Sequence, residues 1–192
     1  MKRAWLFVVA ALSVTQAMAT EVADLTAPSS HVELQHVARA TTTETAQDGV
    51  KQQRYTFQPA AQPQIVVTPA QGTWNWQGQG ELRLRVQNAM PWALTLVVDI
   101  DGADAKSHLH AVVGLPAGPA QTLVVPLHAT TPLAFGMQVG PGRPFDDNGA
   151  RVLVATTVAG ALDLAGVRDV RLSMPAPQAA QSILLGHPYH RG

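Results

Sequence analysis

The 192-residue sequence has no cysteine, few aromatic residues and few charges, and each shortage narrows what the chain can be. Without cysteine there is no disulfide framework, so stability must come from a buried core, and a chain of this length buries enough apolar surface to fold unaided. Charged residues make up 14% of the chain and the formal net charge is zero. This balance argues against nucleic acid or an anionic membrane as the main partner.

The sequence also lacks the motifs of common catalytic and nucleotide-binding sites. No G-x-S-x-G nucleophile elbow, no H-E-x-x-H zinc motif and no phosphate loop is present. The acidic residues lie in turns or beside arginines on strands, and no spacing singles out the two carboxyl groups that glycoside hydrolysis needs. The sequence therefore predicts a protein that is not an enzyme and carries no cofactor.

The only long apolar run lies at the start of the chain. Lys2 and Arg3 precede it, the run covers residues 4–14, and Ala17-Met18-Ala19 fits a small-x-small cleavage site. This is the pattern of a signal peptide over residues 1–19, and the run is too short to span a bilayer comfortably. An uncleaved anchor is the alternative. We expect export to the periplasm or the extracellular space, with no membrane attachment once the leader is removed.

The segment that follows the leader, residues 20–62, is poor in large apolar side chains and rich in Ala, Thr and Gln. It has no sustained period, although Arg54–Phe57 fits a short strand and residues 31–40 fit a weak helix. We interpret residues 20–62 as a flexible arm or linker.

Two runs with period two dominate the middle of the chain. Leu82, Leu84 and Val86 alternate with polar residues, and the run over residues 93–100 alternates in the same way. Such runs predict strands with one buried face, here two antiparallel strands joined by a turn at residues 88–92. Shorter strand patterns cover residues 65–68, 107–113, 121–127, 151–158, 170–174 and 181–185.

Many short strands with almost no helical period predict an all-β fold. We expect a jelly-roll-like antiparallel β-sandwich over residues 63–187, followed by a tail at 188–192.

The order of several short motifs resembles one known family. The motifs are Trp74-Asn75-Trp76, Leu82–Asn88, Thr95–Asp99, Leu115–Gly118, Thr122–Leu127, Phe135-Gly136-Met137 and Leu162–Val167. Over roughly residues 65–185 the chain resembles the carbohydrate-binding-module-like domain at the N-terminus of bacterial β-agarases. The resemblance implies a β-sandwich fold and a role with polysaccharide, such as agar.

In that family the sandwich precedes a (β/α)₈ barrel that hydrolyses agar polysaccharides. This chain stops where a barrel of on the order of 200 residues or more would begin. The resemblance therefore implies a non-catalytic module, either a free-standing relative or the remnant of a split agarase. The alternative is a structural module that packs against a protein partner, as its relatives pack against their barrel.

Candidate sugar contacts follow from the way sugars are recognised, by stacking on exposed aromatic rings and by hydrogen bonds to hydroxyl groups. The candidates of these types are Trp74, Trp76, Trp92, Arg143, Phe145, Asp146 and Asn148. The alternative for Trp74 and Trp76 is that they fill one end of the core, because Trp is usually largely buried. The alternative for residues 143–148 is a solvated connecting loop.

Two groups of residues bear on metal binding. His108 and His110 share one strand face, which suits zinc, but the sequence shows no third ligand. Asp99, Asp101 and Asp104 lie close together but lack the spacing of a calcium loop, and turn chemistry explains them equally well. We therefore predict no metal site.

Overall fold

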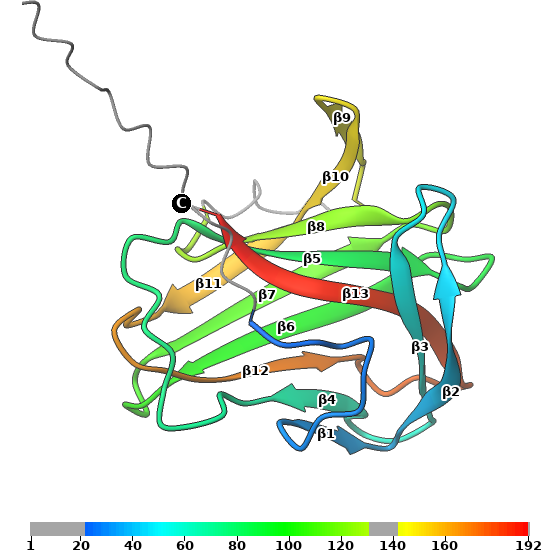
Figure 1. Cartoon of the computed structure of the whole chain (residues 1–192). Coiled ribbons are helices and arrows are strands. Elements are labelled where there is room, and N and C mark those ends of the chain that lie inside the picture. The colour runs from blue at the N-terminus through cyan, green and yellow to red at the C-terminus, as the bar shows by residue number, and fades with distance from the viewer. Residues whose placement is uncertain (1–21, 131–141, 192) are drawn as a thin grey trace, which may run out of the picture.

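The structure, a computed structural model, describes residues 22–130 and 142–191. In these ranges the chain forms thirteen strands and no helix, and the strands make two sheets packed face to face (Figure 1). The prediction of an all-β sandwich is confirmed. The described ranges accordingly hold no helix that could cross a membrane. The leader at 1–19 and the motif Phe135–Met137 lie outside the described residues.

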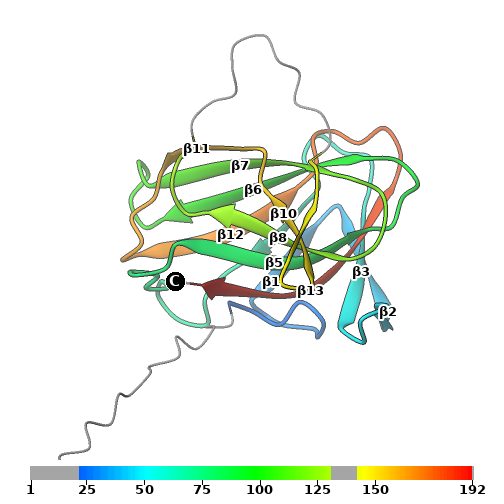
Figure 2. The same cartoon turned by 90° about the horizontal axis from the view of Figure 1, so that it is seen from above.

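The two sheets contain six and seven strands. The six-stranded sheet has the spatial order β1 (Val32–Gln35), β4 (Gln64–Val67), β12 (Val167–Ser173), β6 (Leu94–Gly102), β7 (His108–Leu115) and β11 (Thr157–Ala161). The seven-stranded sheet has the order β2 (Val37–Thr45), β3 (Lys51–Phe57), β13 (Gln181–Arg191), β5 (Glu81–Asn88), β8 (Gln121–Pro126), β10 (Ala150–Val154) and β9 (Phe145–Asp147). Among these strands β8 and β10 pair in parallel, and the other pairs are antiparallel. Figure 2 shows the two layers from above.

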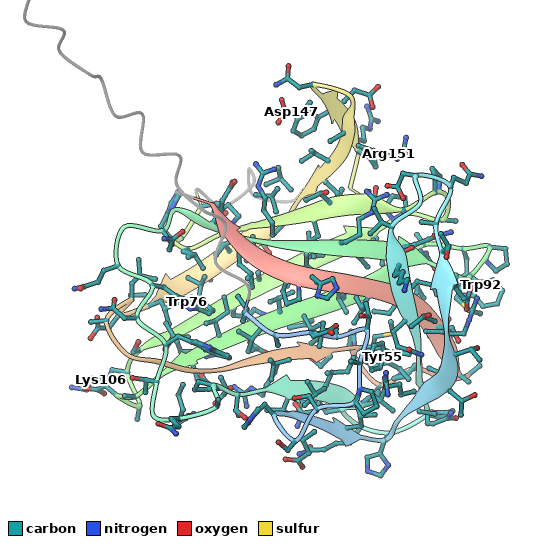
Figure 3. The ribbon with its side chains drawn as sticks, in the orientation of Figure 1. Tyr55, Trp76, Trp92, Lys106, Asp147 and Arg151 are labelled. Carbon is teal, nitrogen blue, oxygen red and sulfur yellow. The ribbon has the colours of Figure 1, made fainter. Side chains whose placement is uncertain are left out.

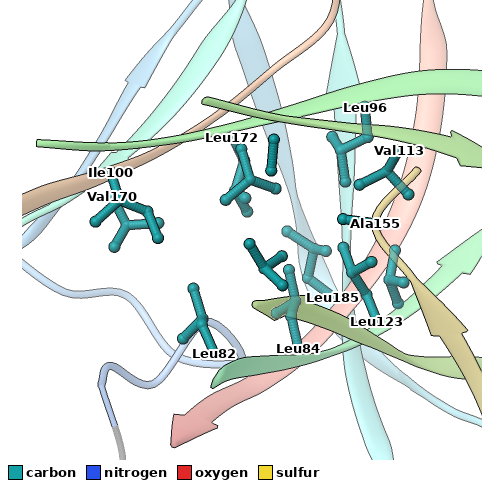
Figure 4. Close-up of a cluster of buried hydrophobic side chains, with 14 of the residues drawn as sticks. Leu82, Leu84, Leu96, Ile100, Val113, Leu123, Ala155, Val170, Leu172 and Leu185 are labelled. Atoms are coloured by element: carbon teal, nitrogen blue, oxygen red, sulfur yellow. The ribbon is translucent and has the colours of Figure 1, made fainter. Parts of the chain in front are cut away.

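The core lies between the sheets and follows from the alternation of the strands. Leu82 and Leu84 of β5 are buried, whereas Arg83 and Arg85 between them are partly exposed. Figure 4 shows these leucines facing Leu172 and other apolar side chains of the opposite sheet. Period-two alternation therefore predicted correctly which residues of this strand are buried.

The predicted pairing of the two central runs is wrong. They form β5 and β6, but β5 lies in the seven-stranded sheet and β6 in the six-stranded sheet. The buried Asn88 stabilises the turn by which the chain passes from one sheet to the other. Its amide donates to the carbonyl oxygens of Trp92 (2.7 Å) and Leu115 (3.1 Å), and its Oδ1 accepts from the backbone N–H of Met90 (2.9 Å). Alternation shows which face of a strand is buried but carries no information about its partner.

The interpretation of residues 20–62 as a flexible arm is wrong for the described part. The segment forms β1, β2 and β3, and strands occupy most of residues 31–40, where a weak helix was expected. Tyr55 and Phe57 are fully buried, and the Tyr55 hydroxyl donates to the carbonyl oxygen of Leu25 at 2.7 Å. The sandwich therefore begins well before residue 63.

A buried amide explains why so polar a segment can join the sheet. The pairing of β2 with β3 shifts register between Arg39 and Thr43. Gln53 is buried at this bulge, and its Nε2 donates to the carbonyl oxygens of Ala40 (2.7 Å) and Thr42 (3.2 Å). These bonds satisfy backbone groups that the bulge leaves without strand partners.

The second half of the chain differs from the prediction in three places. The expected tail at 188–192 is, as far as Arg191, part of β13, which pairs with β5 over this stretch. Residues 151–158 belong to two strands in different sheets, β10 and β11. Residues 143–148, for which a solvated connecting loop is the alternative, contain β9, which pairs with β10 through a tight turn at Asn148-Gly149. Both turn residues have positive φ, 49° and 84°, as the Asn-Gly turns of hairpins require.

Replacing Phe57 tests whether the N-terminal segment belongs to the core. The substitution Phe57→Ala should lower the free energy of unfolding by about 3–5 kcal/mol, because it leaves a cavity under β3. Urea denaturation followed by tryptophan fluorescence measures this loss. Phe145→Ala is the control, since that ring is 52% exposed, and should change stability by less than about 0.5 kcal/mol. Equal small effects would show that residues 22–62 do not pack.

Candidate functional site

The pair Trp74 and Trp76 packs against the core rather than forming a sugar platform. Trp76 is 3% exposed and stacks on Trp74, with ring centroids 5.4 Å apart and an interplanar angle of 24°. The backbone of Trp74 pairs with Val167 through hydrogen bonds of 2.8 and 2.9 Å, and its half-buried ring lies against the core. The prediction of Trp76 as an accessible platform is therefore wrong, and its alternative as a core residue is confirmed. Figure 3 shows Trp76 beside the body of the sandwich.

Trp92 is an exposed ring held in a defined position. Half of its surface is exposed, and its Nε1 donates to Gln181 Oε1 at 2.9 Å. It borders a shallow hollow of about 230 Å³ at the end of the sandwich, also lined by Thr95, Met174 and Pro177. Trp92 thus presents an apolar face to solvent. Its backbone is held by the hydrogen bond that the Asn88 amide donates to the Trp92 carbonyl oxygen.

The β9–β10 hairpin carries the other predicted contacts. Arg143, Phe145, Asp146 and Asn148 are all exposed, and Phe145 is one of the largest exposed apolar side chains. Figure 3 shows the hairpin standing away from the sandwich, with Asp147 near its tip.

Strand register connects Phe145 to the outer face of the sheet. Phe145 pairs with Val152, Val152 with Thr122, and Thr122 with Arg85. Paired residues point to the same side of a sheet, and Arg85 alternates with the inward Leu84 and Val86. Phe145 therefore faces the same side as Arg85.

A cleft lies on this face, where three turns meet above β5. The turn between β2 and β3, the turn between β7 and β8, and the tip of the β9–β10 hairpin surround a volume of about 370 Å³. The lining residues are Gln47, Asp48, Arg85, Gln87, Pro119, Ala120, Gly149, Ala150 and Arg151. Its size falls within the range of small-molecule and cofactor sites in proteins.

Sequence reasoning missed these cleft residues. Arg83, Arg85 and Gln87 alternate on the polar side of β5, which is a signal for an outward polar row. Nothing in the sequence places Asp48, from the turn between two other strands, against Arg85. That contact depends on β13 lying between β3 and β5.

The cleft offers hydrogen-bonding groups of several kinds. Asp48 forms an ion pair with Arg85. Arg151 makes no ion pair or side-chain hydrogen bond with a described residue, and its Nε is buried without a partner. The amides of Gln47 and Gln87 add both donors and acceptors. Such an arrangement can bind a ligand that carries many hydroxyl groups.

The charge state of Asp48 depends on its neighbours. Partial burial raises the pKa of the carboxyl group, but the hydrogen bond from the backbone N–H of Val50 and the Arg85 guanidinium lower it by more. The pKa of Asp48 therefore lies below its usual 3.8. The ion pair is complete above that value and is lost as the pH falls through the lowered pKa.

Three comparisons relate this geometry to known proteins. No family model matches the sequence, and no curated protein matches it. Among solved structures, an exo-β-agarase aligns at a TM-score of 0.69 with 14% identity, over 92% of this chain and 25% of that chain. A family 11 carbohydrate-binding module from Clostridium thermocellum, in complex with a β-1,3-1,4-mixed-linked tetrasaccharide, aligns at 0.53 with 11% identity, over 92% and 98%. A family 29 carbohydrate-binding module aligns at 0.52 with 11% identity, over 91% and 92%.

The chain has the fold of a carbohydrate-binding module. The resemblance to the sandwich domain of β-agarases is confirmed at the level of fold. The chain spans about a quarter of the length of the agarase chains that it matches. The identities are far too low to transfer residue roles, so the cleft must be judged by its own chemistry.

An NMR titration of Asp48 tests the geometry of the cleft. The carboxyl carbon should titrate with a pKa below 3.8, and Arg85→Gln should move that pKa upward, because the neighbouring positive charge is removed. Arg168→Gln gives a control, since that arginine lies on β12 in the other sheet and its replacement should leave the pKa of Asp48 unchanged. An unchanged Asp48 pKa in the Arg85→Gln variant would contradict the ion pair.

Proposed function

We propose that this protein is an exported, non-catalytic module that binds polysaccharide in the cleft above β5. The observation that carries the proposal is the cleft itself, a hollow of about 370 Å³ lined by amide and guanidinium groups on the outer side of β5. Carbohydrate-binding modules with the same fold support the class of ligand. Export rests on the leader pattern of residues 1–19.

Binding would combine hydrogen bonds with contact against an aromatic ring. Gln47 and Gln87 can donate to and accept from sugar hydroxyls, and Arg151 supplies donors that no described carboxylate occupies. Phe145 lies three strand spacings, about 14 Å, from Arg85 along this face, and Thr122 and Val152 between them are buried. Phe145 then marks one end of the bound chain.

Trp92 is a second aromatic contact in this proposal. Its ring is half exposed and held by Gln181, so stacking would cost little side-chain entropy. It lies at the end of the sandwich and borders its own hollow, separate from the cleft residues. A long polysaccharide could touch both sites, whereas a short oligosaccharide would need only the cleft.

The polysaccharide we propose is of the agar type, because the agarase structures and the sequence resemblance point in that direction. The competing function is a module that packs against a protein partner, such as a hydrolase barrel. It is supported by the agarase chains, of which the matched region is only about a quarter.

Affinity electrophoresis in gels containing agarose tests the proposal. The chain should be retarded, and Arg151→Ala should weaken binding about tenfold, as expected for a lost hydrogen bond from a charged group. Arg168→Ala is the matched control, because that arginine lies on β12 in the other sheet and should leave binding unchanged. Trp92→Ala should reduce retardation on agarose but not binding of short oligosaccharides.

Two results would contradict parts of the proposal. Retardation that survives Arg151→Ala, Gln87→Ala and Phe145→Ala would place sugar binding outside the cleft. No retardation by agarose, mixed-linked β-glucan or other algal and plant polysaccharides would favour the protein-packing module instead.

A further inference from the structure

The outer face of the six-stranded sheet brings together the groups of a transition-metal site. His108 and His110 are two apart on β7 and share its outer face. Across the β6–β7 ladder, His110 pairs with Asp99 and His108 pairs with Asp101. Two imidazoles and two carboxylates thus form adjacent cross-strand pairs. The six-stranded sheet is not the one that carries the cleft.

Three of these side chains converge on a common point. Asp99, His108 and His110 each offer one ligand atom, and the three atoms lie within 4.8 Å of one another. His108 Nε2 is 3.5 Å from Asp99 Oδ1, and His110 Nδ1 is 2.7 Å from the same oxygen. Ligand atoms on a tetrahedral zinc ion lie about 3.4 Å apart, given bonds of roughly 2.0–2.2 Å. His108 Nε2 and Asp99 Oδ1 already have that separation. His110 Nδ1 and Asp99 Oδ1 are at hydrogen-bond distance and must move slightly apart when a metal ion binds.

Asp101 fixes His108 in the tautomer that a metal ligand needs. Its Oδ1 lies 2.6 Å from His108 Nδ1. An ionised carboxylate can only accept, so Nδ1 carries the proton and Nε2, the nitrogen facing Asp99, keeps its lone pair. Asp101 is itself held by ion pairs with Arg171 and Arg168. Carboxylates commonly orient metal-binding histidines in this way.

Asp99 is the member of the cluster whose negative charge is least compensated. It is buried, with 8% of its surface exposed, and within residues 22–130 and 142–191 its side-chain partners are the two histidines alone. Arg171 lies opposite Asp99 in the ladder, yet its guanidinium pairs with Asp101 and Asp169 instead. A buried carboxylate without a permanently charged partner is costly, and a metal ion would remove that cost.

We propose that Asp99, His108 and His110 form a binding site for a divalent transition metal of the zinc type. Two nitrogens and one carboxylate oxygen suit Zn²⁺, Co²⁺, Ni²⁺ or Cu²⁺, whereas Ca²⁺ and Mg²⁺ prefer oxygen ligands alone. Both histidines are more than 40% exposed at their side chains, so the ion has access from solvent and water can complete its coordination. When the metal binds, His110 takes the tautomer with its proton on Nε2, so that Nδ1, which faces Asp99, offers its lone pair to the ion.

Calorimetric titration of the untagged full chain with ZnCl₂, after removal of metal with EDTA, tests the site. We expect saturable binding of one ion. His108→Gln and His110→Gln should each weaken it at least tenfold, and Asp101→Asn should weaken it roughly 10–100-fold through loss of orientation. Co²⁺ should give the intense visible absorption of tetrahedral coordination in the parent chain and not in the His108→Gln/His110→Gln double variant.

The control variant is His128→Gln, because His128 is exposed and lies outside the cluster; it should bind zinc like the parent. Unfolding curves of the histidine variants verify that they remain folded. Equal zinc affinity in the parent and the double variant would overturn the proposal, and so would the absence of saturable zinc uptake. Neither result would affect the sugar-binding proposal, which concerns the other sheet.

Discussion

The apolar layer between the two sheets is the constraint on which every other feature depends. With no cysteine in the chain, no disulfide ties one sheet to the other. Each interior strand must therefore give one side of its alternating side chains to this layer, as Leu84 does from one sheet and Leu172 from the other. The opposite sides are left free for polar chemistry. Both proposed sites occupy such free sides.

This division of faces explains how much could be predicted from the sequence. Alternation identified β5, β6, β7 and β12 and their buried faces, because burial imposes period two directly on a strand. It could not identify partners: the adjacent runs of β5 and β6 entered different sheets. Among the N-terminal strands it detected only the end of β3, Arg54–Phe57, because the polar Gln53 takes a buried position whose need arises only from the bulge in β2.

The candidate sites show the same limit. Exposure of Trp92 and Phe145 agrees with their selection as aromatic contacts, whereas Trp76 is buried although the polar Asn75 and Gln77 flank it. His108 and His110 were recognisable as a pair from their spacing alone. Asp99 became a third member only through the β6–β7 register, which sets it opposite His110. Sites assembled across strands depend on register, and register is a property of the folded sheet.

The position of β13 has a consequence for how the protein folds. This strand, residues 181–191, lies between β3 and β5, so the seven-stranded sheet remains in two pieces until it is in place (Figure 1). Its partner β3 is encoded far earlier in the chain, and such distant pairing slows folding. During synthesis one edge of β3 therefore stays unpaired until β13 has been made, and this edge can pair with other chains. Folding speed and aggregation should both respond most strongly to changes in this strand.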